Sequence, residues 1–251
     1  MHTTVSFIKK ATTNERWITV DLYIDDNWKR IGVRLSGGAD SSIIYYSLCK
    51  HFLNTDTKII PLTMTTPRNW WYKKGARIVI DRVDELLGTK TTEHFVYQDQ
   101  TPHTDESYVA AVDHLSEQAH KKYNLDAIYI GLTRNPPVHE MKEYFTTEFC
   151  TKRNLDQETV YRYIIDRDTE RDDQVEPEVL TIYDGKLQQV IPFANLNKVA
   201  TRQLYDLENI QQELYPYTYS CEKVIPEDSD LNHCGYCFFC LERYWAFGRL
   251  V

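Results

Sequence analysis

No run of about 18 or more apolar residues occurs in this sequence, so we expect no helix that crosses a membrane. Residues 1–4 also do not open a basic stretch followed by an apolar run, which is the pattern of a secretory signal peptide. Together these two absences favour a soluble, cytoplasmic protein that has no membrane partner.

Positive charge is scarce, because 29 Lys and Arg residues stand against 37 Asp and Glu residues and give a net charge of −8. A surface that holds nucleic acid by neutralising phosphates needs an excess of positive charge, so we expect a small-molecule substrate rather than nucleic acid. A local basic groove would still be compatible with this balance. The eight His residues show neither His-x-Glu nor His-Glu-x-x-His spacing, so nothing supports a catalytic zinc ion.

Short, β-branched segments alternate with segments of helical periodicity through much of the chain. A chain of 251 residues that is 42% hydrophobic can bury a sizeable core. The alternation predicts parallel βαβ units in a Rossmann-like, doubly wound α/β sheet. The expected helices are 75–87, 107–123, 198–207 and 241–247, and one that starts after residue 42. The expected strands are 5–8, 17–24, 31–35, 57–63, 92–98, 126–131 and 189–193.

The regular pattern loosens over residues 136–185, where the charged run 166–173 predicts a solvated insertion or mobile loop. We therefore expect an α/β domain over 1–210, with a charged insertion at about 138–185. A small, cysteine-rich element over 211–251 should follow it.

A glycine-containing loop, Ser36-Gly37-Gly38-Ala39-Asp40-Ser41-Ser42, lies between an expected strand and the next helix. Open α/β sheets bind ligands at this position, and the N–H groups of a helix N-terminus attract anions. Gly37 and Gly38 allow a sharp turn and a close approach to a polyanion, while the serine hydroxyls add donors. Asp40 should be exposed there and would repel a phosphate unless it holds Mg²⁺ or orients the loop. The alternative is a glycine turn with a Ser or Asp helix cap.

Two common phosphate-binding motifs are absent, because the loop is neither a Walker A sequence nor a G-x-G-x-x-G sequence. Residues 36–41 instead resemble the SGGxDS signature of the PP-loop ATP pyrophosphatases. The resemblance implies that the loop holds the β,γ-pyrophosphate of ATP while a substrate oxygen attacks the α-phosphate. The products would be an adenylate and pyrophosphate.

Cysteine is rare before residue 220, and then Cys221-x12-Cys234-x2-Cys237-x2-Cys240 supplies four thiols. Four thiolates are what a closed, tetrahedral structural Zn²⁺ site needs, and the spacing suits a metal better than disulfides. Gly235 suits a turn that points backbone N–H groups at sulfur. Four buried free cysteines and an iron–sulfur cluster are the alternatives.

Two cysteines stand outside this group. Cys49 falls on the helix after the glycine loop and is expected in the core. Cys150 falls in the insertion and stays a candidate for the reactive cysteine that a thiolating enzyme would need.

The C-terminal segments narrow this resemblance to one family of enzymes. Residues 217–221 and 234–243 resemble the tail of the 7-cyano-7-deazaguanine synthases of queuosine biosynthesis, and residues 191–198 resemble that family's Pro-Leu segment with Lys198 at its lysine. The resemblance implies a ligase that converts a 7-deazaguanine carboxylate into an amide and then a nitrile, with ATP, ammonia and structural zinc. Residue 2 is His2, not the Cys of an N-terminal glutaminase, so we expect free ammonia or nitrogen from a partner.

Arg134 and Lys198 follow expected strands, where a cation can offset the charge that develops on an α-phosphate. Each is alternatively a solvated surface cation. We therefore predict an ATP-dependent adenylating enzyme with catalytic Asp40, Lys198 and Arg134. It would use Mg²⁺ at residues 36–42 and Zn²⁺ at the four cysteines, and a homodimer is compatible with the sequence. The rivals are a PP-loop nucleobase thiolase that acts on RNA and an inactive, zinc-stapled binding protein.

Overall fold

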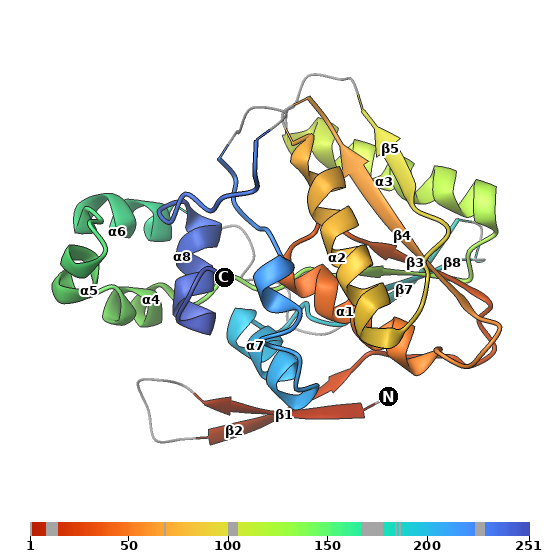
Figure 1. Cartoon of the computed structure of the whole chain (residues 1–251), viewed down its shortest axis with the longest axis horizontal. Coiled ribbons are helices and arrows are strands. Elements are labelled where there is room, and N and C mark those ends of the chain that lie inside the picture. The colour runs from red at the N-terminus through yellow and green to blue at the C-terminus, as the bar shows by residue number, and fades with distance from the viewer. Residues whose placement is uncertain are drawn as a thin grey trace.

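The computed structural model describes residues 2–8, 15–67, 69–99, 105–166, 178–183, 185, 187–223 and 229–251. A six-stranded sheet with the order β5-β4-β3-β6-β8-β7 forms its centre (Figure 1). Its neighbouring strands are parallel except β7 and β8, which pair antiparallel at one edge. The strands are β3 (Arg30–Arg34), β4 (Lys58–Thr65), β5 (Phe95–Gln98), β6 (Ala127–Ile130), β7 (Glu178–Ile182) and β8 (Leu187–Ile191).

Helices cover both faces of this sheet, which confirms the predicted doubly wound α/β class. Successive side chains of a strand point to opposite faces. Ile31 and Val33 of β3 therefore share one apolar cluster with α1 (Ala39–His51), α2 (Trp71–Leu87) and α7 (Lys198–Leu207). Ile60, Leu62 and Met64 of β4 pack on the other face against α3 (Asp105–Tyr123).

The strand order places a topological switch point at β3. The chain passes from β3 outward to β4 and β5, and it then returns through α3 to β6 on the other side of β3. Ligands of open α/β sheets bind in the crevice beyond the carboxyl ends of the strands at such a point. The segments that follow β3 and β6 meet at this crevice.

Residues 136–185 were expected to form a solvated insertion or a mobile loop. The mobile-loop alternative is wrong for the first half of this range, because three short helices form there. They are α4 (Val138–Tyr144), α5 (Thr147–Lys152) and α6 (Gln157–Ile165), and they lie with α8 (Phe238–Phe247) to one side of the sheet (Figure 1). Met141 and Phe145, and likewise Val160 and Ile164, stand four residues apart and are buried. This helical spacing was hidden among charged residues. The part of the charged run at 167–173 lies outside the described residues.

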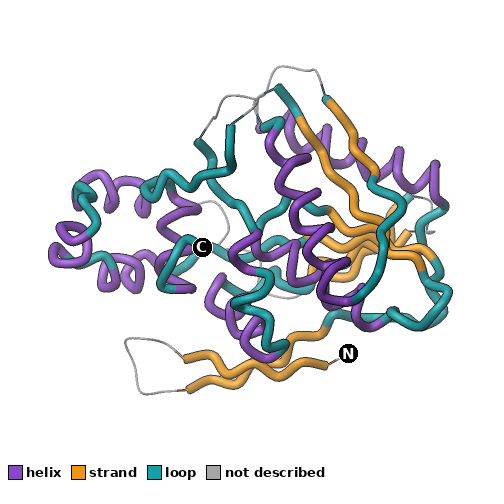
Figure 2. The backbone as a smooth tube through the Cα atoms, in the orientation of Figure 1, coloured by secondary structure: helices purple, strands orange, loops and turns teal. Residues whose placement is uncertain are grey.

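The remaining elements are a hairpin and a short helix. Strands β1 (His2–Ile8) and β2 (Glu15–Asp21) pair antiparallel, and this hairpin is separate from the main sheet and lies beside α7 (Figure 2). A 3-10 turn, η1 (Tyr215–Tyr217), leads into the cysteine-rich segment. Within the described ranges no helix is long and apolar enough to cross a membrane.

One half-buried histidine, His94, makes the stability of this fold depend on pH. The Thr63 hydroxyl donates to the carbonyl of Leu35, so it accepts from Nε2 of His94 at 2.8 Å. Burial, aided by the charges of Arg77 and Lys73, lowers the pKa of His94 from 6.5 to about 4. Between these two values the unfolded chain binds more protons than the folded protein, so stability rises with pH.

We therefore expect the free energy of unfolding to fall when the pH is lowered from about 6.5 toward 4, and to fall less steeply in His94→Gln. Glutamine keeps an N–H donor for Thr63 but does not titrate. Urea unfolding at a series of pH values measures the difference. Equal slopes for the two proteins in this pH range would contradict the assignment.

Candidate functional site

The loop between β3 and α1 has a shape that only glycine permits at residue 37. Gly37 has a φ of +86°, and a Cβ there would lie 2.5 Å from the carbonyl carbon of Gly75 and 2.9 Å from the nitrogen of Ala76 in α2. Gly38 is the extended N-cap residue of α1. The first N–H groups of α1 have no partners within the helix, and they begin at the switch point of the sheet.

The serines of the loop have different surroundings. The Ser36 hydroxyl accepts from the N–H of Gly38 at 3.3 Å, while Ser42 is fully buried and donates to the Gly38 carbonyl at 2.7 Å. Ser41 also donates to that carbonyl, at 3.2 Å. Ala39 is buried and accepts through its carbonyl from the core residue Tyr205. Of the three serines of the loop, Ser36 and Ser41 line the adjacent pocket.

Asp40 is not the exposed loop carboxylate that we expected. It lies in the first turn of α1, where its side chain is 13% exposed and its Oδ2 is 2.6 Å from Nζ of Lys198. Oδ2 also lies 3.5 Å from the Thr133 hydroxyl. Oδ1 is buried and has no hydrogen-bond partner in the part of the chain that the structure describes. A carboxylate oxygen that has no hydrogen-bond partner can act as a ligand for a cation such as Mg²⁺.

Lys198 is a buried cation, so the alternative of a solvated surface lysine is wrong. It follows Asn197, whose side chain caps α7, and its Nζ lies between Asp40 and Oε2 of Glu242 in α8, at 2.6 and 3.1 Å. Burial alone would lower the pKa of Lys198, but the two carboxylates outweigh burial and raise it. Lys198 is therefore protonated and held in place.

Arg134 reaches the same edge of the sheet through its backbone. Its N–H donates to the carbonyl of Leu196 at 2.8 Å, which joins the segment after β6 to the segment after β8. The catalytic role of its guanidinium stays a prediction.

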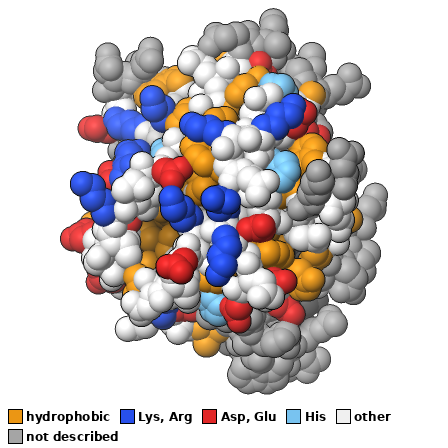
Figure 3. Space-filling view, turned by 90° about the vertical axis from the view of Figure 1, so that its right-hand side faces the viewer, with side chains coloured by type: hydrophobic (Ala, Val, Ile, Leu, Met, Phe, Trp, Pro, Cys, Tyr) orange, Lys and Arg blue, Asp and Glu red, His pale blue; other side chains and the backbone are white. Residues whose placement is uncertain are grey.

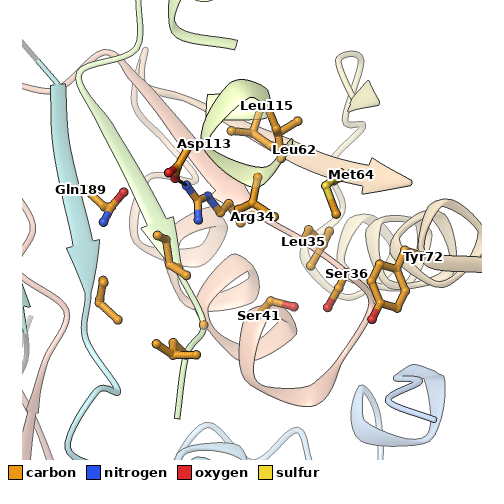
Figure 4. Close-up of a pocket in the computed structure, with 15 residues that line it drawn as sticks. Arg34, Leu35, Ser36, Ser41, Leu62, Met64, Tyr72, Asp113, Leu115 and Gln189 are labelled. Carbon is orange, nitrogen blue, oxygen red and sulfur yellow. Dashed lines mark hydrogen bonds and ion pairs between the residues drawn. The ribbon is translucent and has the colours of Figure 1, made fainter. Parts of the chain in front are cut away.

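A pocket of about 390 Å³ opens beside the loop (Figure 4). Ser36, Ser41 and Tyr72 lie toward one end of it, whereas Arg34 and Asp113 lie at another. Between them the walls are mainly apolar, which suits a flat heterocycle. The apolar lining residues are Leu35, Leu62, Met64, Val112, Leu115, Ile130, Leu132 and Ile191.

Sequence reasoning found Ser36 and Ser41 but missed three other polar residues of this pocket, which are Arg34, Asp113 and Gln189. Arg34 donates to the Ser116 hydroxyl at 2.7 Å and approaches Asp113 at 3.4 Å. A charge at the carboxyl end of an apolar strand was a usable signal for Arg34. Asp113 and Gln189 belong to no motif, so only the fold brings them here.

The four cysteines of the tail converge on one point. Their Sγ atoms all lie within 4.8 Å of one another, and two pairs are 3.9 Å apart. Backbone N–H groups point at sulfur, from Cys237 to Cys234 and from Cys234 to Cys221, and Gly235 turns the chain with a φ of +83°. Hydrogen bonds from the neighbouring thiols, first that of Cys234, hold the pKa of Cys221 well below its usual value. This arrangement suits a single metal ion.

No protein-family model matches the sequence, and no curated protein sequence matches it. Among solved structures, the U34-tRNA thiolase NcsA from Methanococcus maripaludis with its [4Fe-4S] cluster has a TM-score of 0.44 and 11% identity, over 86% of this chain and 70% of that one. The NAD+ synthetase from Burkholderia pseudomallei has a TM-score of 0.39 and 12% identity, over 88% of this chain and 74% of that one. Neither likeness assigns an activity here.

We expect Gly37→Ala to lower the free energy of unfolding more than Gly88→Ala. Both glycines have positive φ, +86° and +66°, so both variants carry the strain of a left-handed alanine. Only Gly37 faces the backbone of another helix, whereas nothing lies within 4 Å of a Cβ at Gly88. Urea unfolding of the two variants measures the difference. Equal losses would show that α2 does not press on the loop.

Proposed function

We propose that the protein is an ATP-dependent adenylating enzyme of the PP-loop pyrophosphatase type. The observation that carries this proposal is the position of the SGGxDS string, at the switch point of the sheet, between β3 and the N-terminus of α1. The N–H groups of the first turn of α1, the hydroxyls of Ser36 and Ser41, and an apolar pocket converge there. This combination suits a nucleotide whose base enters the pocket while its phosphates lie on the loop.

In this proposal residues 36–42 bind the pyrophosphate part of ATP, and the pocket beside Leu35 and Met64 takes the adenine. Oδ1 of Asp40 would hold Mg²⁺, which offsets the charge of the phosphates when it is bound. Lys198 fixes Asp40 by its ion pair and adds a positive charge behind the loop. Arg134 would stabilise the charge that develops on the α-phosphate.

The substrate proposed is a carboxylate on a 7-deazaguanine or a related heterocycle, which the enzyme would convert to an amide or nitrile with ammonia in the cytoplasm. Support comes from the tail motif and from Lys198, which matches the lysine of the resembled segment and forms an ion pair with Asp40 of the loop. Positioning of ATP and the carboxylate would supply most of the rate enhancement.

One observation favours the rival, a thiolase that acts on RNA. A groove of about 830 Å³ beside α2 has Trp70, Lys73, Lys74 and Arg77 among its lining residues. Figure 3 shows basic and acidic side chains mixed on the face at the right of Figure 1. RNA binding that weakens steeply with salt would favour this rival.

The cysteines outside the metal cluster do not favour the thiolase. Burial raises the pKa of Cys49 to about 12, and burial also raises the pKa of Cys150, which is 2% exposed. Neither thiol is therefore poised as a reactive thiolate. For the other rival, an inactive binding protein, the release of pyrophosphate is the discriminating measurement.

ATP should be cleaved to AMP and pyrophosphate, because the loop holds the two outer phosphates as the leaving group. Chromatography of the nucleotides after incubation with Mg²⁺, ammonia and a 7-deazaguanine carboxylate measures this. Asp40→Asn should lower the rate on the order of 10²- to 10³-fold. Asp81→Asn, which breaks only an exposed ion pair with Arg77, is the matched control. ADP as the sole product would overturn the proposed function.

We propose Zn²⁺ as the metal at the four cysteines. Zn–S bonds of about 2.3 Å in a tetrahedron place the sulfurs about 3.8 Å apart. The two 3.9 Å pairs match this value. A four-iron cluster binds each cysteine to a different iron and spreads the sulfurs further.

Cys237→Ser should lose bound zinc and lower the melting temperature, because the binding energy of a structural metal becomes folding energy. Elemental analysis and thermal unfolding measure the two effects. Cys49→Ser is the matched control, since Cys49 lies outside the cluster and should keep one zinc per chain. Iron in the wild-type protein would refute the zinc assignment.

A further inference from the structure

Arg243 is a fully buried cation that the proposed chemistry does not use. It stands on α8 with 0% exposure, and its guanidinium donates to the Thr218 hydroxyl at 2.9 Å and to the Ser220 hydroxyl at 3.3 Å. Nε and Nη2 donate to the carbonyl of Leu250. The guanidinium also lies over the ring of Tyr215, 4.1 Å from its centroid. Across the described ranges no carboxylate forms a salt bridge with Arg243.

Packing alone does not account for a guanidinium in this place. Burial without a carboxylate partner is costly, and burial lowers the pKa of Arg243. An apolar side chain of similar length would fill the same space without that cost. What a guanidinium adds is a rigid set of donors that holds several acceptors at fixed positions. Two of these acceptors, Thr218 and Ser220, belong to one short segment of the tail.

This tail segment lies directly against the glycine loop. The N–H of Tyr219 donates to the carbonyl of Gly37 at 2.7 Å. A Cβ on Gly38 would stand 3.4 Å from the Ser220 hydroxyl and 3.9 Å from the Tyr219 carbonyl. Residues 218–220 therefore form one wall of the loop.

The hydrogen bond from Tyr219 fixes the orientation of a peptide group. In a trans peptide the C=O of one residue and the N–H of the next point in opposite directions. Because Tyr219 holds the Gly37 carbonyl toward the tail, the N–H of Gly38 must point away from the tail. It turns toward the side of Ser36, whose hydroxyl accepts it at 3.3 Å.

We propose that Arg243 is a positioning residue for the loop at 36–38. Through Thr218 and Ser220 it holds the tail segment that sets the Gly37–Gly38 peptide, and so presents the donors of the loop to the outer phosphates of the ligand. This inference rests on the proposed function, since the ligand it names is the pyrophosphate part of ATP.

The test compares two variants with a matched control. Arg243→Met keeps the length of the side chain and removes its donors, and Ser220→Ala removes one acceptor beside Gly38. Arg249→Met is the control: Arg249 lies over the same Tyr215 ring, at 5.6 Å, and donates to residues 211 and 212 but not to the tail segment. Calorimetry with Mg²⁺ measures the affinities for ATP, inorganic pyrophosphate and AMP. Zinc content and melting temperature are recorded for each protein.

Arg243→Met should weaken ATP and pyrophosphate binding on the order of 10- to 100-fold, as a displaced binding group does. Ser220→Ala should weaken both about 5-fold, the effect of one hydrogen bond. AMP affinity should stay within about 2-fold, because AMP lacks the outer phosphates. A purely structural role would lower the folded fraction and leave the dissociation constants of the folded protein unchanged.

Four outcomes would overturn the inference, and the last of them is distinguishable because it also overturns the proposed function. Unchanged pyrophosphate affinity in folded Arg243→Met contradicts it, and so does an equal loss for AMP and pyrophosphate. If Arg243→Met does not fold, an unchanged affinity in Ser220→Ala decides against it. A folded, zinc-loaded wild-type protein that binds neither ATP nor pyrophosphate would instead overturn the proposed function, and the inference would fall with it.

Discussion

The buried ion pairs of Lys198 join three parts of the chain that lie far apart in sequence. Lys198 begins α7, Asp40 lies in the first turn of α1, and Glu242 lies on α8 among the metal-site residues. The side chains of Lys198 and Glu242 are each 4% exposed. Removing one member of such a network leaves an uncompensated charge in the interior, at a cost on the order of 3–5 kcal/mol. The ion pairs therefore fix the positions of the loop, α7 and the tail relative to one another.

This network also explains how a carboxylate such as Asp40 can stand at the proposed phosphate site. A carboxylate beside a polyanion is unfavourable, but Lys198 already neutralises one side of it, through Oδ2. The other oxygen, Oδ1, has no hydrogen-bond partner among the described residues. In Asp40, Oδ2 thus binds Lys198, whereas Oδ1 is available to bind a cation. Charge balance at the loop depends on residues from both ends of the chain.

Much of the architecture could be predicted from the sequence, because local patterns determine it. The strand at 31–35, the glycine loop and the helix at 198–207 each have their own periodicity or turn chemistry, and the structure has them nearly at the expected bounds. The spacing of the four cysteines in the sequence was enough to predict that their side chains come together. The helices at 138–165 escaped notice because short amphipathic helices rich in charge resemble loops when their packing partner is unknown.

What escaped prediction depends on contacts between distant residues. No local pattern shows that Tyr219 donates to Gly37, or that Asp113 and Arg34 meet in one pocket. Asp40 was expected in solvent because its partner, Lys198, stands 158 residues away. Burial of a polar residue is a property of the assembled fold, and a motif tells only which chemistry the residue can perform.

The long separation in sequence between the loop and the residues that contact it bears on when the loop is completed during synthesis. The glycine loop leaves the ribosome while Lys198, 158 residues beyond Asp40, and the tail are still untranslated. Until they emerge, a nascent chain has the sheet strands around the loop but not the wall that orients it. Under the proposed function, a partly made chain would not yet hold the loop in position for a nucleotide.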